Sequence, residues 1–346
     1  MTGVIARYAA YLPVTDATPR VTLGEGSTPL VHSSRIGPAL GLPRLYFKYE
    51  GLNPTGSFKD RGMCVAVARA LEGGATTLLC ASTGNTSASA AAYAAHYRLR
   101  AVVVMPALGV AAGKVAQALA YGATIVPVRG TFDVALQLVR RLGDRPDVAL
   151  VNSVNPFRIE GQKTAAFEIV EEVGGSPSRV FIPVGNGGNI TAYWRGFRES
   201  AGRMAGGCPR MHGAQAAGAA PLVRGKPVAH PRTAASAIRI GNPASWKGAI
   251  AAREESGGTI EIVTDAQILA AHRRLSAEEG LLVEPASAAG VALLINKAAA
   301  GQLSADETIV CILTGQGLKD PKAMVKGLKL PAPVEPTIEV LAAAMG

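Results

Sequence analysis

The segment EGLNPTGSFKDRGM, residues 50–63, follows a predicted buried strand, Leu45–Tyr49, and opens an alanine-rich helix. It places Lys59 in the first turn of that helix. A positive charge there opposes the helix macrodipole, which lowers the affinity of the amine for its proton and suits a nucleophile. From Lys59 alone, a surface lysine solvated by its neighbours Asp60 and Arg61 is the simpler explanation.

The rest of the chain repeats this order of strand and helix. Short runs of branched apolar residues alternate with alanine-rich helical patterns, which predicts an α/β fold with mostly parallel sheets and helices on both faces. Two wholly apolar runs, Val102–Val104 and Ile309–Leu313, are typical of parallel strands buried on both sides. Ligands of such sheets bind beyond the carboxyl ends of the strands, so we expect the functional residues in the loops that follow the strands. The predicted strands are Leu45–Tyr49, Thr76–Ala81, Ala101–Met105, Thr124–Val128, Val148–Val151, Arg179–Val184, Ile260–Val263 and Thr308–Leu313. The predicted helices are Phe58–Leu71, Thr86–His96, Lys114–Tyr121, Asp133–Leu142, Ile159–Val173, Ile190–Ser200, Ala266–Glu279 and Ala286–Ala299.

Composition narrows the class of protein. The chain has 346 residues, which suggests about two domains, and 48% hydrophobic residues exclude a mainly disordered chain. The net charge of +10 raises the question of nucleic acid, but the basic residues are scattered and aromatic residues make up only 5%. We therefore expect anionic small ligands and no nucleic acid.

Signals for export, membranes and metals are missing. No apolar run approaches the roughly 20 residues of a membrane span, and the N-terminus lacks a signal-peptide core. The four cysteines form no C-x-x-C pair, and the histidines show no metal-ligand spacing. We expect a cytoplasmic protein with buried thiols, no metal and no membrane partner.

Three further loops hold polar groups at predicted strand ends. Ser82, Thr83 and Asn85 precede a helix, the glycine-rich stretch 184–190 could hold a phosphate, and Thr314 ends the last strand. Each has an ordinary explanation as a helix cap, a turn or a strand end. Taken together with the lysine, they match the needs of pyridoxal 5′-phosphate, an aromatic aldehyde with one phosphate.

Seven stretches of the sequence then resemble the threonine synthases, a family of fold-type II pyridoxal-phosphate enzymes, in their short bacterial and archaeal form. The resemblance extends from about Ile5 to Lys322 and implies a two-domain, tryptophan synthase β-like fold. In that fold a small domain, residues 54–153, closes over the active site of a large domain built from 1–53 and 154–346. The matching stretches are Glu50–Met63, Cys80–Tyr93, Asn152–Ile169, Pro183–Trp194, Gln215–Leu222, Glu284–Ser287 and Thr314–Asp320.

The resemblance implies a role for each cofactor contact. Lys59 would bond covalently to the cofactor aldehyde, Asn85 would bind its phenolic oxygen, and Thr314 would face its pyridine nitrogen. Gly187 stands where family members commonly have alanine, and we expect this change to preserve the phosphate-binding N–H groups. Phe58 would shape the pocket, and the phosphate would be held by Gly185, Asn186, Gly187, Gly188 and Asn189.

The resemblance also implies the reaction, which converts O-phospho-L-homoserine and water to L-threonine and phosphate. Ser82 and Thr83 would bind the substrate carboxylate. The substrate phosphate would be bound by Lys114, Asn152, Ser153, Asn155 and Arg158. The sequence leaves open whether Lys114 is a solvated helix lysine, and whether Arg158 is a surface ion pair. Glu284 could line the cofactor or favour the start of the next helix. A homodimer is typical of the family.

Three alternatives follow from the same residues. A serine or threonine dehydratase of the same fold needs no second phosphate site. A protein that binds pyridoxal phosphate without turnover would form no threonine. A nucleic-acid binder would show salt-sensitive binding to duplex and no cofactor.

Overall fold

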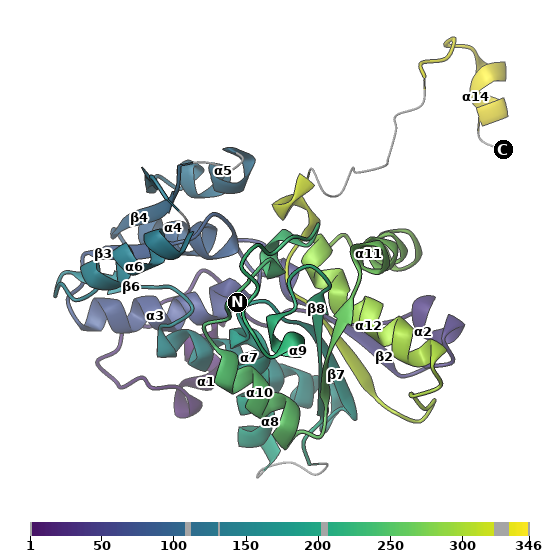
Figure 1. Ribbon diagram of the computed structural model, residues 1–346, viewed down its shortest axis with the longest axis horizontal. Coiled ribbons are helices and arrows are strands. Elements are labelled where there is room, and N and C mark those ends of the chain that lie inside the picture. The colour runs from purple at the N-terminus through teal and green to yellow at the C-terminus, as the bar shows by residue number, and fades with distance from the viewer. Residues whose placement is uncertain (1, 108–111, 131, 202–206, 322–331, 345–346) are drawn as a thin grey trace.

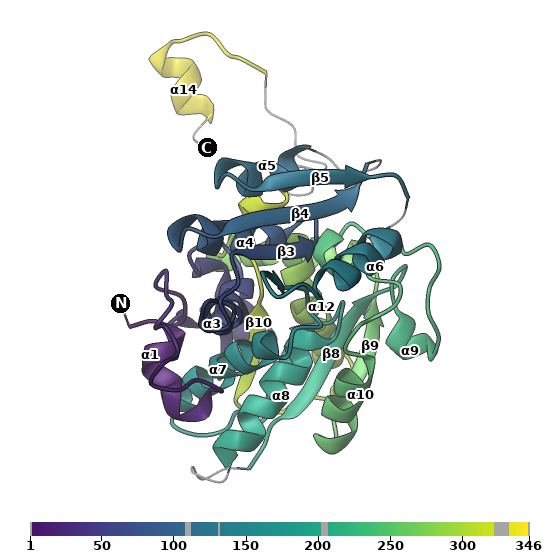
Figure 2. The same ribbon diagram turned by 90° about the vertical axis from the view of Figure 1, so that its left-hand side faces the viewer.

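The computed structural model describes residues 2–107, 112–130, 132–201, 207–321 and 332–344, and it contains two β-sheets with surrounding helices (Figure 1, Figure 2). The strand order is β1-β2-β10-β7-β8-β9 in the larger sheet and β5-β4-β3-β6 in the smaller one. Neighbouring strands are parallel, except that β1 pairs antiparallel with β2. This arrangement confirms the predicted fold class. The strands are β1 (Leu30–His32), β2 (Leu45–Tyr49), β3 (Thr77–Ala81), β4 (Arg100–Pro106), β5 (Thr124–Val128), β6 (Val148–Leu150), β7 (Arg179–Pro183), β8 (Arg210–Ala216), β9 (Thr259–Val263) and β10 (Ile309–Leu313).

Helices cover both faces of the larger sheet. Successive side chains of a strand point to opposite faces, so the apolar side chains of the central strands contribute to a core on each face. Cys311 of β10 and Phe181 of β7 belong to the core beneath α11 and α12, whereas Val310 and Ile312 belong to the core beneath α7, α8 and α10. All four side chains are fully buried, as the apolar run in β10 predicts. The helices are α1 (Val4–Tyr8), α2 (Ile36–Ala39), α3 (Lys59–Glu72), α4 (Asn85–His96), α5 (Ala112–Ala120), α6 (Phe132–Leu142), α7 (Pro156–Val173), α8 (Gly188–Ala201), α9 (Pro221–Arg224), α10 (Trp246–Glu255), α11 (Asp265–Glu279), α12 (Ala288–Ala299) and α14 (Ile338–Ala344). Short 3₁₀ turns are η1 (Ala9–Tyr11), η2 (Glu50–Leu52), η3 (Ser236–Ile238), η4 (Pro285–Ser287) and η5 (Gly317–Lys319).

Strand β8 was not predicted from the sequence, although it lies between β7 and β9 in the larger sheet. The strand has small residues where a branched apolar run would have revealed it. A Cβ atom added to Gly213 would lie 2.8 Å from Cγ2 of Val184. Close packing therefore selects small side chains here and removes the sequence signal. The short antiparallel strand β1 at the sheet edge was also missed.

All four strands of the smaller sheet lie between residues 54 and 153. Its core is formed by side chains such as Leu79, Val104 and Val139, with α6 packed against β3 and β4. The boundaries proposed for the two domains remain a prediction.

The four cysteines differ in their exposure to solvent. Cys64, Cys80 and Cys311 are buried, whereas Cys208 is exposed. The expectation of buried thiols is therefore wrong for Cys208, which lies in the surface connection just before β8.

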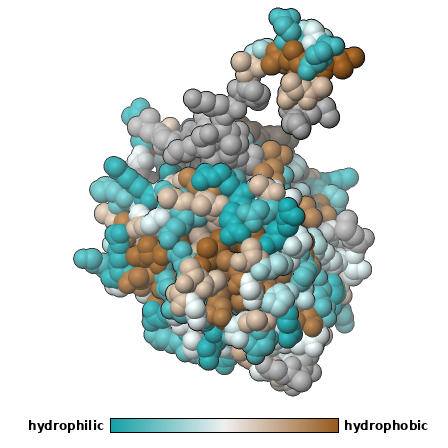
Figure 3. Space-filling view, turned by 90° about the vertical axis from the view of Figure 1, so that its right-hand side faces the viewer, coloured by the Kyte–Doolittle hydropathy of each residue, from teal (hydrophilic) through white to brown (hydrophobic). Residues whose placement is uncertain are grey.

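The C-terminal helix α14 stands apart from both sheets (Figure 1, Figure 2). Its Ile338 and Leu341 are exposed, and Figure 3 shows apolar side chains at this end of the chain away from the body of the molecule. Within the described ranges, no helix combines the length and apolar character required to cross a membrane.

Candidate active site

Three chain segments meet at the end of strand β10. Ser57 pairs with Gly315 in an antiparallel bridge, and the N–H of Phe58 donates to the carbonyl oxygen of Thr314 at 3.0 Å. The N–H of Glu284 donates to the carbonyl oxygen of Gly315, also at 3.0 Å. Backbone bonds alone therefore hold the start of α3, the end of β10 and the start of η4 together.

Lys59 is the first residue of α3, and its side chain is partly buried. Burial lowers the pKa of the amine, the positive charge of Arg158 lowers it further, and Glu284 opposes both, which leaves the pKa at about 7. The Nζ atom lies 4.1 Å from the centroid of the Phe58 ring. A substantial fraction of such an amine is unprotonated at neutral pH, the state that a nucleophile or general base requires.

The two residues after Lys59 do not solvate it. Asp60 is buried and accepts bonds from the N–H and the hydroxyl of Thr55, both at 2.7 Å, and from the hydroxyl of Ser89 at 2.6 Å. Arg61 is fully buried and turns to other partners. The alternative of a surface lysine among solvating neighbours is therefore wrong.

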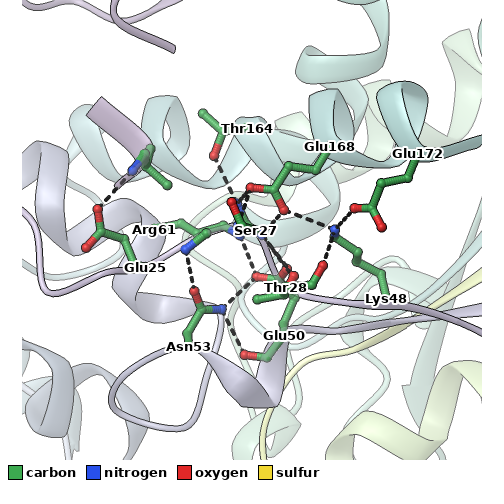
Figure 4. Close-up of polar contacts among 12 residues, drawn as sticks. Glu25, Ser27, Thr28, Lys48, Glu50, Asn53, Arg61, Thr164, Glu168 and Glu172 are labelled. Atoms are coloured by element: carbon green, nitrogen blue, oxygen red, sulfur yellow. Dashed lines mark hydrogen bonds and ion pairs between the residues drawn. The ribbon is translucent and has the colours of Figure 1, made fainter. Parts of the chain in front are cut away.

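A buried charge cluster lies behind the start of α3 (Figure 4). The Arg61 guanidinium donates to Glu50 at 2.7 and 2.8 Å and to Glu168 at 2.7 and 2.6 Å. Its Nη2 also donates to the Thr28 hydroxyl at 3.0 Å, and Lys48 pairs with Glu168 at 3.0 Å. The cluster joins β2, η2, α3 and α7. The cluster was not predicted from the sequence, because a charged residue shows no sign of burial when its partner is far away in the chain, as Glu168 is from Arg61, 107 residues away.

Asn85 and Glu284 form a contact beside Lys59. The Nδ2 atom of Asn85 donates to the two carboxylate oxygens at 3.1 and 3.3 Å. Burial raises the pKa of Glu284, while the bond from Asn85 and the charges of Lys319 and Lys59 oppose the rise. The Glu284 side chain does not cap the following helical turn. Of the two possibilities that the sequence left open, the structure therefore shows Glu284 facing the site.

The glycine loop between β7 and α8 packs closely against neighbouring backbone. A Cβ atom on Gly185 would lie 2.9 Å from Cα of Ile238, and one on Gly187 would lie 2.9 Å from the carbonyl oxygen of Ser245. Gly187 also has a φ of +80°, in the left-handed region. In this chain the close approach of Ile238 and Ser245 therefore favours glycine at both positions, although sequences of the resembling family commonly have alanine at 187. The loop leads directly into the start of α8, where free N–H groups are available to a ligand.

The two asparagines of this loop differ. Asn186 is used within the protein, because its Nδ2 donates to the Ser153 hydroxyl at 2.9 Å and its Oδ1 accepts from the N–H of Ala244 at 2.9 Å. In contrast, neither amide atom of the buried Asn189 finds a hydrogen-bond partner among the described residues. Buried polar groups are normally bonded, so Asn189 indicates the place of a ligand.

Thr314 forms a buried hydroxyl pair with Ser287. The two side-chain oxygens are 2.9 Å apart, and Ser287 Oγ accepts the N–H of Gly315 at 2.9 Å. Thr314 was predicted from the sequence, but Ser287 was not, although its position in the EPAS stretch 284–287 was an available signal.

Arg158 lies in the first turn of α7 and is 1% exposed. Its Nη1 donates to the carbonyl oxygen of Val151 at 3.1 Å, while Nε and Nη2 have no partner in the part of the chain that the structure describes. Burial lowers the pKa to about 10, so the guanidinium still carries its charge at neutral pH. The alternative of a surface ion pair is therefore wrong for Arg158.

Two asparagines near Arg158 are used for local structure. Asn152 accepts the N–H of Ala81 at 2.9 Å and donates to its carbonyl oxygen at 2.8 Å. Asn155 caps α7 by accepting the N–H of Phe157 at 3.0 Å and donates to the carbonyl oxygen of Leu150 at 2.8 Å. Both therefore shape the site rather than present free amides to it.

The remaining predicted residues lie on the smaller-sheet side. Ser82 accepts the N–H of Gly84 at 3.2 Å, and Thr83 is partly exposed beside it. Lys114 belongs to helix α5, but its side chain lies outside the described residues.

These groups fit pyridoxal phosphate. Lys59 offers an amine of lowered pKa for the aldehyde, and the glycine loop with the unpartnered Asn189 amide offers a phosphate site. The Thr314 and Ser287 hydroxyls offer a neutral partner for a ring nitrogen.

Comparison with known protein families agrees with this geometry. A sequence model described as pyridoxal-phosphate dependent enzyme matches residues 21–315. The chain belongs to this family. Solved structures of similar fold include the processed form of threonine deaminase isoform 2 from Solanum lycopersicum. That structure has a TM-score of 0.74 at 23% identity, covering 86% of this chain and 82% of the other, and the likeness concerns the fold alone.

Two relatives of higher sequence identity are threonine synthases. A threonine synthase from Synechocystis sp. is 55% identical, covering 99% of this chain and 91% of the relative. A threonine synthase from Halalkalibacterium halodurans is 51% identical, covering 97% of this chain and 95% of the relative.

Gly187→Ala should weaken cofactor binding. The added methyl group meets the Ser245 carbonyl and forces a non-glycine residue to a positive φ, which costs about 1–2 kcal/mol. We expect a roughly tenfold higher Kd for pyridoxal phosphate, measured by titrating the apoenzyme. Gly257→Ala is the control, because Gly257 has a φ of +62° and open space around its Cβ position. An unchanged Kd in Gly187→Ala would show that the loop adapts without disturbing the phosphate site.

Proposed function

We propose that this protein is a threonine synthase, which converts O-phospho-L-homoserine and water to L-threonine and phosphate. Relatives of that name are 51–55% identical over nearly the whole chain. The observation that supports a phosphorylated substrate best is Arg158, a buried guanidinium with two unpartnered nitrogens among the described residues. Arginine binds phosphate through such paired N–H donors.

Lys59 would act as the nucleophile and the proton carrier. Bound pyridoxal phosphate supplies an electron sink that stabilises negative charge at the substrate Cα atom. The lysine amine, with its pKa at about 7, would remove the proton from Cα and exchange protons at the neighbouring carbon. Phe58 would keep water from the amine, since its ring lies against Nζ.

Asn85, Thr314 and the glycine loop would orient the cofactor. One hydrogen of the Asn85 amide is directed at Glu284, which leaves the other for the phenolic oxygen. Thr314, supported by Ser287, would donate to the pyridine nitrogen. The phosphate would lie on the N–H groups and the Asn189 amide at the start of α8, where the helix dipole favours an anion.

The substrate would be bound at its two anionic ends. Ser82, Thr83 and nearby N–H groups would bind the carboxylate at the start of α4. Arg158 and Lys114 would bind the phosphate, while Asn152 and Asn155 hold the surrounding backbone in place. Ser153 would act through its bond to Asn186, which links the substrate loop to the cofactor loop.

Product analysis tests the proposal directly. Purified enzyme with pyridoxal phosphate should release phosphate and threonine in equal amounts from O-phospho-L-homoserine. Formation of ammonia and a 2-oxo acid from serine or threonine would instead support the dehydratase. Bound cofactor without any product would support a binding protein. The homodimer remains a prediction from the resemblance, and the cytoplasmic location remains a prediction from the sequence.

Arg158→Ala should raise KM for O-phospho-L-homoserine. Loss of charged hydrogen bonds worth about 1.5–3 kcal/mol predicts a roughly 10- to 100-fold increase. Arg198→Ala is the control, because Arg198 is an exposed residue paired with Glu255 on the surface. Steady-state kinetics at low substrate measure both. If the two variants behave alike, the phosphate is bound elsewhere.

A further inference from the structure

Lys319 is a partly buried lysine that the roles above do not use. It ends η5, in the loop that follows Thr314. Its Nζ donates to the carbonyl oxygen of Thr55 at 2.9 Å and to the side-chain oxygen of Gln117. No described carboxylate forms an ion pair with it. Burial lowers its pKa, which the more distant charges of Glu284 and Asp60 oppose.

Gln117 connects this contact to helix α5. It lies on α5, the helix that also contains Lys114, and its Nε2 donates to the same Thr55 carbonyl oxygen at 3.1 Å. One oxygen therefore accepts from both Lys319 and Gln117. Three segments meet there: the loop before Lys59, helix α5 and η5.

The rest of Thr55 is bound on the other side. Its N–H and hydroxyl both donate to Asp60, which also accepts from Ser89 of α4. Asp60 thus fixes Thr55 relative to the start of α3. Lys319 bonds to both Thr55 and Gln117, which fixes α5 relative to Thr55. A partly buried ammonium bonded only to neutral oxygens loses hydration without gaining an ion pair. An apolar side chain would fill the same space equally well. The N–H donors of the lysine therefore indicate that Thr55 and Gln117 must be held in a fixed orientation.

We propose that Lys319 is a positioning residue for the substrate phosphate: through Gln117 and Thr55 it holds helix α5, and with it Lys114, against the cofactor side of the site. This inference rests on the proposed function, since α5 matters here only if the substrate is phosphorylated. The effect belongs to substrate binding and not to the chemical step.

Lys319→Met tests the proposal. We expect KM for O-phospho-L-homoserine to rise roughly tenfold, the effect of one charged hydrogen bond, with kcat changed less than about threefold. The inhibition constant of inorganic phosphate should rise in parallel. The visible absorption of bound cofactor and its Kd should stay the same, because the glycine loop and Lys59 are not altered.

Two further variants separate positioning from general damage. Gln117→Leu removes the link from its other end and should give the same rise in KM, and it decides the matter if Lys319→Met does not fold. Lys319→Arg keeps the charge and donors and should restore much of the affinity. Lys297→Met is the control, because Lys297 is another buried lysine, bonded to Glu261 and Gln302 away from this junction. It should lower stability and leave KM unchanged.

The results that would contradict the role of Lys319 differ from those that would contradict the proposed function. An unchanged KM in both Lys319→Met and Gln117→Leu overturns the proposal. A shifted pH profile of kcat with unchanged KM also overturns it, because Lys319 would then act through its charge on Glu284 or Asp60. If wild-type enzyme forms no threonine, the proposed function fails first. If wild type is active and the variants match it, only the role of Lys319 fails.

Discussion

Replacing Lys59 with alanine is expected to abolish threonine formation, with a loss of at least about 10³-fold in kcat. The variant removes both the amine that bonds to the aldehyde and the group of pKa about 7 that would move the proton. The absorption of lysine-bound cofactor should vanish as well. Phosphate release and the visible spectrum measure the two effects separately.

The spectrum also shows whether the variant still folds. Lys59→Ala leaves the glycine loop and Asn189 intact, so cofactor should still bind without a covalent bond and more weakly. Lys247→Ala, at an exposed position of α10, is the matched control and should keep both the spectrum and the activity. Wild-type activity in Lys59→Ala would remove the lysine from the mechanism.

Local patterns made much of this site predictable from the sequence. Thr314 directly follows strand β10, Asn85 and the loop 185–189 lie between a strand and the helix after it, and Lys59 begins the helix that follows β2 and a turn. Parallel strands place their carboxyl ends at one edge, so loops far apart in sequence were expected to meet. The bonds between Phe58 and Thr314, and between Asn85 and Glu284, are consistent with that reasoning.

Contacts over long distances in the sequence were not predictable in the same way. Ser287, Lys319 and Arg61 act through partners that no spacing rule connects to them. Nor did the sequence separate residues that face the site from those that support it. Asn152 and Asn155 were expected to bind phosphate, yet their amides bond to neighbouring backbone. Side-chain direction depends on the final packing, which composition and periodicity do not encode.

Arg61→Met is expected to lower the free energy of unfolding by about 3–5 kcal/mol, the usual effect of removing one partner from a buried ion pair. Two carboxylates, Glu50 and Glu168, would lose their shared cation in a site that is closed to water (Figure 4). Urea unfolding of the holoenzyme measures the change. Arg145→Met is the control, because Arg145 pairs with Asp147 on the surface, where water screens the pair and its loss should change stability little.

The pH dependence of stability tests the same cluster independently. Burial alone would raise the pKa of Glu168, but the charges and bonds of Arg61, with Lys48, outweigh burial and lower the pKa to about 2. A lowered pKa means that the ionised form stabilises the folded state above the unfolded pKa of about 4.5, and that this contribution disappears as pH falls from there towards 2. Wild type should lose about 3 kcal/mol from this group over that range.

Arg61→Met should show a smaller loss. Without the guanidinium, Lys48 is the cation that remains beside Glu168, so burial is opposed less and the pKa of Glu168 lies higher than in wild type. Acid then neutralises a charge that contributes less to the folded state. The stability difference between variant and wild type should therefore shrink as pH falls from 6 towards 3. For the same reason, Glu168→Gln should lower stability at neutral pH less in the Arg61→Met variant than in wild type. A difference that stays constant with pH would mean that Arg61 acts through packing, with Glu168 bearing no charge that matters to the fold.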